Sequence, residues 1–264
     1  MMRRLRRHDG FEVEVRVTSD AFIRPPRESQ RNWAVNRALN EFVEHLRHLD
    51  GVARTWVAGR EHTGLGDRGA SELRDDEIME DWQIPVMKAM ASFAAGSHGD
   101  ILEVGFGRGV SASLLQDDGV RSHTIVECNA SIIQRFHVWR ANLPANRDVR
   151  LIEGRWQGVT EQFTQYDGIL FHTYPLDEEE YVESVVRGVT FAAGFFPVAA
   201  AHLRPGGVFT YLTNEADSLS RAHQRLLLAH FREFRMQRVL NLSLPANSGD
   251  DLWADSMVVV AAIS

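Results

Sequence analysis

The 264-residue sequence has a single cysteine, Cys128, and no long hydrophobic run. One cysteine excludes a disulfide framework within the chain. The longest apolar stretch, Phe195–Ala201, is far shorter than the roughly 18 apolar residues that a membrane span requires. The basic segment Met1–His8 is followed by Asp9 and Gly10, not by the apolar core of a secretory signal. We therefore expect a cytoplasmic protein.

An excess of basic residues is also missing, since 29 Lys and Arg face 36 Asp and Glu, for a net charge of −7. Nucleic-acid binding requires a concentrated basic face, and here only Arg3–Arg7 forms a basic cluster. We expect neither nucleic acid nor a membrane as partner, and a small molecule instead. The content of 44% hydrophobic and 25% charged residues is that of a folded globular protein.

Two parts of the chain differ in their sequence pattern. In the first, residues 1–75, Phe11–Val17 alternates like a half-buried strand, and a helix is expected from Ser29 until Gly51. A Gly-rich loop, Gly59–Gly69, follows; it is either a linker or a lid that closes over a ligand. We expect this extension to precede one large domain over residues 76–264, and a homodimer through the extension stays open.

In that domain, short apolar strands alternate with segments of helical periodicity. The predicted strands are Ile101–Val104, His123–Glu127, Val149–Glu153, Gly168–His172, Val208–Thr213, Phe234–Leu242 and Ser256–Ile263. The predicted helices are Glu77–Ala95 (interrupted near Pro85), Val110–Gln116, Ala130–Asn142, Glu179–Leu203 and Ser218–His230. This alternation predicts a doubly wound, mostly parallel α/β sheet. The last two strands have no helix between them and should pair antiparallel at an edge.

A glycine-rich turn, Gly105-Phe106-Gly107, ends the first strand of the domain. Glycines there let the backbone turn sharply and let a ligand approach the next helix. The dinucleotide fingerprint needs a third glycine where Val110 stands. Glu103 precedes the turn; its carboxylate would repel a pyrophosphate but suits an ammonium group. The turn therefore favours S-adenosylmethionine, which carries an ammonium group and no phosphate.

Glu127 lies 22 residues beyond Gly105, at the end of the next apolar strand. An acid at that place can accept hydrogen bonds from both hydroxyls of a ribose. The alternative is a carboxylate that merely faces water at a strand end. The upstream glycine turn at the matching distance favours the ribose interpretation.

Several sequence blocks together resemble the guanidinoacetate N-methyltransferase family. They are Ile78–Met87, Leu102–Gly107, Val126–Asn129, Glu153–Trp156, Asp167–Leu176 and Arg204–Tyr211. The resemblance implies a Rossmann-like class I methyltransferase fold, with a seven-stranded mostly parallel sheet and an antiparallel edge strand. It also implies an S-adenosylmethionine-dependent methyltransferase that acts on a small polar metabolite.

The resemblance also implies roles for individual residues. Gly105, Phe106 and Gly107 would line the methionine part of the cofactor, Glu127 would hold its ribose, and Cys128 and Asn129 would lie beside it. The remaining implied residues are Arg155 and Trp156 at the adenine, Met87 near the sulfonium, Glu80 facing the substrate, and Tyr174 in the catalytic segment. Core packing stays an alternative for Trp156 and Met87, and a solvated acidic helix face for Glu80.

His172 departs from the family pattern. The family segment reads Y-D-T-Y-P-L, with the Asp as catalytic base, whereas this chain has Phe171–Leu176 with His172 at the acid's position. A guanidinium has a pKa of about 13 and needs a carboxylate to hold it and accept its proton. A neutral imidazole supplies no negative charge. We therefore expect N-methylation of a guanidino- or amine-bearing substrate other than guanidinoacetate.

Three roles of His172 stay open: general base for an easier nucleophile, substrate orientation, or no chemical role. O-methylation with His172 as base and a cofactor-binding protein without catalysis are the alternative functions. His45 and His48 lie one helical turn apart, but no third ligand accompanies them, so we expect no metal site.

Overall fold

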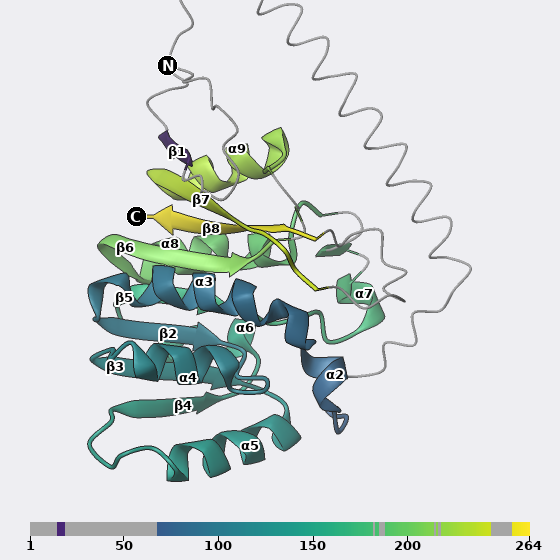
Figure 1. Ribbon diagram of the computed structural model, residues 1–264, viewed down its shortest axis with the longest axis vertical. Helices are drawn as coiled ribbons and strands as arrows, with labels where there is room; N and C mark the ends of the chain where they lie inside the picture. Colours follow the sequence, from purple (N-terminus) through teal and green to yellow (C-terminus); the bar gives the residue numbers. More distant parts are fainter. Residues whose placement is uncertain are drawn as a thin grey trace, which may run out of the picture.

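The computed structural model describes residues 15–18, 68–181, 183–184, 188–213, 215, 218–243 and 255–264 (Figure 1). Their strands form one sheet in the order β1-β7-β8-β6-β5-β2-β3-β4. The strands are β1 (Val15–Thr18), β2 (Asp100–Val104), β3 (Ser122–Glu127), β4 (Val149–Glu153), β5 (Tyr166–Phe171), β6 (Leu203–Leu212), β7 (Glu233–Val239) and β8 (Met257–Ile263). The predicted mostly parallel α/β sheet of seven strands is confirmed, with β1 as an eighth strand from the N-terminal extension.

Helices cover both faces of this sheet. They are α2 (Asp75–Ile78), α3 (Ile84–Ala94), α4 (Val110–Asp117), α5 (Ala130–Ala141), α6 (Trp156–Val159), α7 (Glu178–Tyr181), α8 (Phe196–His202) and α9 (Arg221–His230). In Figure 1, α3 and α4 lie in front of the strands and α8 behind them. Two separate buried clusters match this arrangement, one joining α3 to β2 and β8, the other joining α8 and α9 to β5 and β6.

The two C-terminal strands pair antiparallel, as expected, and β8 lies between β6 and β7. Every residue of β8 is buried, which its continuous apolar sequence explains, since both faces of an inner strand are covered. β1 pairs antiparallel with β7 through Val15–Thr18. The extension thus contributes the edge strand of the sheet.

The prediction of one long helix over Glu179–Leu203 is wrong. The segment contains α7, a 3-10 helix at Phe191–Phe195 and the separate helix α8. Pro197 lies in the first turn of α8, where its missing N–H and fixed φ are tolerated, whereas inside a longer helix they would break it. Pro85 likewise begins α3 after the 3-10 turn Asp81–Gln83, so the predicted interruption there is confirmed.

A network of four charged side chains ties together the amino ends of four strands. Arg121 binds both carboxylate oxygens of Asp100 at 2.7 Å, and Arg204 reaches Asp100 at 2.9 Å and Asp167 at 2.7 Å. Hydrogen bonds from Arg121, Ser122 and Arg204 hold the pKa of the Asp100 carboxyl well below its usual range. This network lies at the edge of the sheet opposite to the strands' carboxyl ends.

Most of the N-terminal extension lies outside the described residues. This applies to the predicted helix from Ser29, to His45 and His48, and to the Gly-rich loop up to residue 67. The lid and the homodimer therefore stay predictions. Within the described part of the chain, no helix combines the length and apolar character needed to cross a bilayer.

Candidate active site

Two adjoining cavities open at the carboxyl ends of β2, β3 and β5, on the right of Figure 1 where α2 and α7 lie. This is where ligands bind in open α/β sheets. The residues shared by both cavities are Gly105, Glu127, Cys128, Thr173, Tyr174 and Leu176. The first cavity extends toward α2 and α4, and the second toward Arg155 and Trp156.

The glycine turn brings two strand ends into direct contact. Gly105 has a φ of +93°, and a Cβ there would lie 2.3 Å from the carbonyl oxygen of His172. The amide of His172 also donates to the carbonyl of Val104 at 3.0 Å. Gly107, at φ +54°, is less crowded, since a Cβ there would lie 3.1 Å from Cγ2 of Ile78. A side chain at Gly105 is excluded by the positive φ and by the nearby His172 carbonyl. The turn therefore leaves open backbone that a ligand can approach.

Phe106 presents its backbone to the cavity and its ring to the core. Its amide donates to Glu127 Oε2 at 3.0 Å. The ring is buried and packs edge-on against Phe136 and Trp139, with centroids at 5.5 and 5.3 Å. The side chain therefore anchors the turn and does not itself face a ligand.

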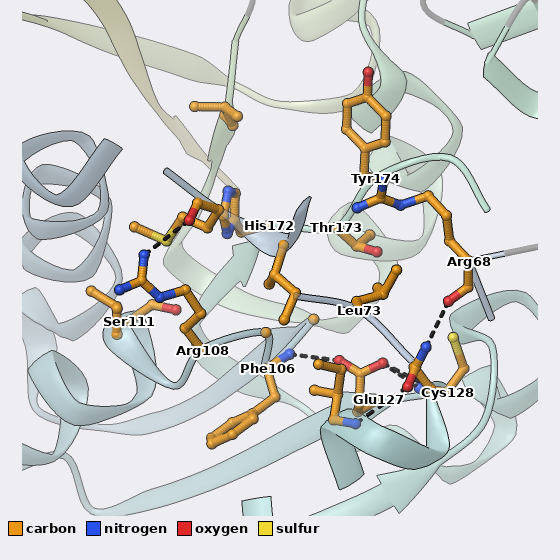
Figure 2. Close-up of a pocket in the computed structure, with 18 of the residues that line it drawn as sticks. Arg68, Leu73, Phe106, Arg108, Ser111, Glu127, Cys128, His172, Thr173 and Tyr174 are labelled. Atoms are coloured by element: carbon orange, nitrogen blue, oxygen red, sulfur yellow. Dashed lines mark hydrogen bonds between the residues drawn. The ribbon is translucent and has the colours of Figure 1, made fainter. Parts of the chain in front are cut away.

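Glu127 lies at the end of β3 and lines both cavities. Its Oε1 accepts from the amides of Cys128 and Asn129 at 2.7 and 2.9 Å, and its Oε2 from Phe106. Figure 2 shows these hydrogen bonds converging on the carboxylate. Three backbone donors fix its orientation, and the remaining lone pairs can accept from hydroxyl groups of a ligand.

Cys128 and Asn129 follow Glu127 and have different functions. Burial and the neighbouring Glu127 raise the pKa of the Cys128 thiol to about 11, so it is a protonated wall residue at neutral pH. Asn129 is buried and caps α5 through Ser131. Its amide group also donates to the carbonyls of Arg68 and Ser71 at 2.7 and 2.8 Å. Asn129 therefore ties residues 68–71 to the rim of the cavity.

Glu103 does not line either cavity. Its carboxylate is fully buried beneath α4, where Ser111 donates to it and His123 Nε2 lies at 2.9 Å. Ser111, in contrast, lines the first cavity. The expected contact of Glu103 with an ammonium group is thus replaced by a contact with Ser111, because alternation along β2 points Glu103 into the sheet–helix interface.

His172 follows the last residue of β5 and lines the first cavity. Burial lowers the pKa of its imidazole to about 4, so the ring is neutral at neutral pH. No described residue forms a hydrogen bond with its ring nitrogens. Figure 2 shows the ring beside the segment that runs on through Thr173 to Tyr174. A neutral hydrogen-bonding group therefore stands at the position where the sequence resemblance implies an acid.

Glu80 is exposed, lines neither cavity, and accepts a hydrogen bond from the indole of Trp82. The same segment contributes Met79 and Gln83 to the first cavity instead, because the 3-10 turn at Asp81–Gln83 directs Gln83 inward. Arg108 holds this segment by donating to the Met79 carbonyl at 2.9 Å and to Asp81 at 2.8 Å. The side chain that faces the cavity is thus an amide and not the expected carboxylate.

Met87 and Trp156 both pack, but only one of them borders a cavity. Met87 belongs to α3, is fully buried in the core, and lines neither cavity. Trp156 packs edge-on against Phe195 at 5.1 Å and also borders the second cavity together with the exposed Arg155. The second cavity therefore has the aromatic wall that the resemblance assigns to an adenine.

Sequence reasoning missed several residues that line the first cavity, among them Arg68, Gln83 and Arg108. Gln83 and Arg108 lie inside or beside blocks already singled out, so their positions carried a signal. Arg68 lies in the Gly-rich loop Gly59–Gly69, which the sequence indicated only as a linker or a lid, without singling out any side chain. Its place depends on contacts with Asn129, Leu176 and Tyr174, which are distant in sequence.

Known proteins resemble this chain in sequence. The sequence model of guanidinoacetate N-methyltransferase matches residues 55–245, well over half of the chain. The chain belongs to this family. It therefore contains a Rossmann-like class I methyltransferase domain whose cofactor is S-adenosylmethionine. The match begins at residue 55, within the N-terminal extension.

Curated relatives include yeast proteins named protein arginine N-methyltransferase 2. That of Kluyveromyces lactis is 26% identical over 145 residues, which are 52% of this chain and 32% of the relative. That of Saccharomyces cerevisiae is 22% identical over 219 residues, 78% of this chain and 49% of the relative. The chain thus spans only about a third to a half of the length of these relatives.

Similar solved structures include spermidine synthase from Thermotoga maritima, with a TM-score of 0.46 and 13% identity over 69% of this chain and 59% of that chain. The glycopeptide N-methyltransferase MtfA, complexed with S-adenosylhomocysteine, has a TM-score of 0.43 and 16% identity. That similarity covers 69% of this chain and 90% of that chain.

Proposed function

We propose that this protein methylates an uncharged nitrogen of a small polar acceptor, with His172 facing that nitrogen. The observation that carries the proposal is the neutral imidazole of His172 at the end of β5, in the cavity that also contains the glycine turn. S-adenosylmethionine, when bound, supplies a methyl group that leaves its sulfonium as the acceptor's lone pair forms the new N–C bond.

The residues present fit this cofactor. The open backbone at Gly105 and Gly107 accommodates the methionine part, and the oriented carboxylate of Glu127 is suited to the ribose hydroxyls. Arg155 and the edge-packed Trp156 border a cavity suited to the adenine. Holding the cofactor and acceptor in line, and excluding water, are the main contributions that a protein makes to this type of transfer.

A guanidinium acceptor suits the cavity poorly. It has no nucleophilic lone pair until it loses a proton, and its pKa is about 13. Among the described residues that line the first cavity, the one carboxylate is Glu127, which is engaged by three backbone amides. Gln83 and His172 contribute a neutral amide and an imidazole to the same cavity. We therefore favour an acceptor nitrogen that is already neutral.

In this proposal, His172 accepts a hydrogen bond from an N–H of the nitrogen that is methylated. A neutral imidazole does not repel a sulfonium, whereas a protonated one would. A group with a pKa of about 4 is a weak base, so the structure does not favour O-methylation with His172 as general base. To orient a neutral nitrogen, the imidazole of His172 needs only one ring lone pair that accepts a hydrogen bond.

The names of the curated relatives suggest an alternative acceptor, the guanidinium of an arginine in a protein. The same shortage of carboxylates counts against it, because an arginine side chain remains protonated in water. A peptide that contains arginine therefore belongs in the test beside the small molecules.

Release of S-adenosylhomocysteine tests the proposal, with aromatic amines, alkylamines, phenols, guanidinoacetate, arginine and an arginine peptide as acceptors. We expect turnover with aromatic amines, whose nitrogen is neutral at pH 7, and little with alkylamines or guanidino compounds, which are protonated. His172→Asp should shift activity toward guanidino acceptors, whereas the matched variant His172→Asn should not. Preference of the wild type for a guanidino compound would refute the proposal. Cofactor binding without turnover of any acceptor would favour a non-catalytic binding protein.

A further inference from the structure

Arg68 is fixed over the first cavity by its own backbone. Its amide donates to the carbonyl of Leu176 at 2.9 Å, and its carbonyl accepts from Asn129 Nδ2 at 2.7 Å. Leu176 and Asn129 themselves line the cavity. The position of Arg68 therefore depends on two separate rim segments, one following β3 and the other following β5.

The side chain of Arg68 extends to Tyr174. Its guanidinium carbon lies 5.5 Å from the centroid of the Tyr174 ring, and Figure 2 shows the guanidinium between Tyr174 and Thr173. One N–H also donates to the backbone carbonyl of Glu77. A ring face and a carbonyl stabilise a cation, but neither neutralises its charge.

Among the described residues, no carboxylate forms an ion pair with Arg68. Arg108, the other guanidinium in the first cavity, is paired with Asp81 at 2.8 Å. A guanidinium has five N–H donors in a planar fork that matches a carboxylate. Arg68 therefore presents an unneutralised anion-binding group toward the cavity.

We propose that Arg68 binds a carboxylate of the methyl acceptor, so that the substrate is an amine that also carries a carboxylate. This inference rests on the proposed function. Arg68 contacts the Thr173–Leu176 segment, which directly follows His172, and also Asn129 after β3. None of its contacts with described residues is with the glycine turn assigned to the methionine part of the cofactor. The acceptor then has its neutral nitrogen at His172 and its anion at Arg68.

The test measures binding and does not require turnover. Protein loaded with S-adenosylhomocysteine is titrated calorimetrically with pairs that differ only in the anion: 4-aminobenzoate and 4-aminobenzamide, 2-aminobenzoate and 2-aminobenzamide. We expect the wild type to bind at least one carboxylate about tenfold or more tighter than its amide, as a charge-assisted hydrogen bond supports. Arg68→Gln should abolish this preference, and Arg68→Lys should retain part of it.

Arg150→Gln, at an exposed position on β4, is the matched control and should leave the preference unchanged. The carboxylate of the cofactor is the other anion that Arg68 could bind. Affinities of S-adenosylhomocysteine and of 5′-methylthioadenosine, which lacks the amino-acid part, distinguish the two. Arg68→Gln should change neither the affinity of S-adenosylhomocysteine nor that of 5′-methylthioadenosine.

The inference is overturned if Arg68→Gln weakens binding of S-adenosylhomocysteine but not of 5′-methylthioadenosine, or if the wild type prefers no carboxylate in any pair. A carboxylate preference that depends on Arg68, without turnover of any amine, would instead refute the proposed function and leave the anion site standing.

Discussion

Gly105 and His172 touch: a Cβ on Gly105 would lie 2.3 Å from the carbonyl oxygen of His172. The turn proposed to hold the cofactor and the residue proposed to face the acceptor are thus packed backbone to backbone. A change at either position is transmitted to the other, because closely packed main chain cannot yield without shifting both strand ends.

Gly105→Ala tests this contact. The substitution places a methyl group against the His172 carbonyl at a φ of +93°, which costs about 1–3 kcal/mol in backbone strain alone. We expect a lower free energy of unfolding in urea and at least about tenfold weaker binding of S-adenosylmethionine by calorimetry. Gly96→Ala is the control, since nothing lies within 4 Å of a Cβ there. Equal cofactor affinity in both variants would contradict the assignment of the turn.

Glu127→Gln tests the carboxylate proposed to bind the ribose. Each Glu127 oxygen accepts from a backbone amide, so either orientation of the glutamine turns an NH₂ group against an N–H donor. We expect calorimetry to show S-adenosylhomocysteine binding weakened by about 10-fold to 100-fold, the equivalent of one or two charge-assisted hydrogen bonds. Glu153→Gln, at the paired position on β4 and exposed, should bind like the wild type.

The catalytic rate should not depend on pH between about 5.5 and 7.5. Burial holds the pKa of His172 near 4, so the ring stays neutral throughout this range and gains a proton only in stronger acid. The measurement is kcat at saturating 4-aminobenzoate or another accepted amine whose nitrogen does not titrate in that range. A step near pH 6.5 that disappears in His172→Asn would show that the imidazole titrates as if it were exposed.

The same shift in pKa predicts an effect on stability. Between its unfolded pKa of about 6.5 and its folded pKa of about 4, His172 binds a proton in the unfolded chain but not in the folded one. The free energy of unfolding should therefore fall as the pH is lowered through this window. Urea unfolding at pH 7 and pH 4.5 should show a smaller decline for His172→Asn than for the wild type.

Asp100→Asn should destabilise the fold without affecting the cofactor. Asp100 accepts from Arg121, Ser122 and Arg204, and its lowered pKa means that this stabilisation exists at neutral pH and is lost as the pH falls below about 4. We expect the free energy of unfolding at pH 7 to drop by about 1–3 kcal/mol. Cofactor affinity should not change, because the network lies at the amino ends of the strands, whereas the cavities lie at their carboxyl ends.

Local sequence determined most of the fold. Strand β4 has the predicted bounds, Val149–Glu153, and β2, β3 and β8 differ from prediction by one residue at one end, because their apolar patterns and bounding polar residues are local signals. The long helix predicted over Glu179–Leu203 is wrong because periodicity alone does not reveal where Pro197 and the preceding turns interrupt it. The place of β8 between β6 and β7 also required the assembled sheet.

For the site, the sequence by itself determined the residues that lie on continuous motifs: the glycine turn, Glu127 and the departure at His172. Only the tertiary structure decided which side chains face the cavity. Glu80 points to solvent while Gln83 points inward, Glu103 is buried beneath α4, and Arg68 stands over the cavity. A one-dimensional motif gives the order of residues along a strand or turn, whereas the direction of each side chain depends on how distant segments pack against it.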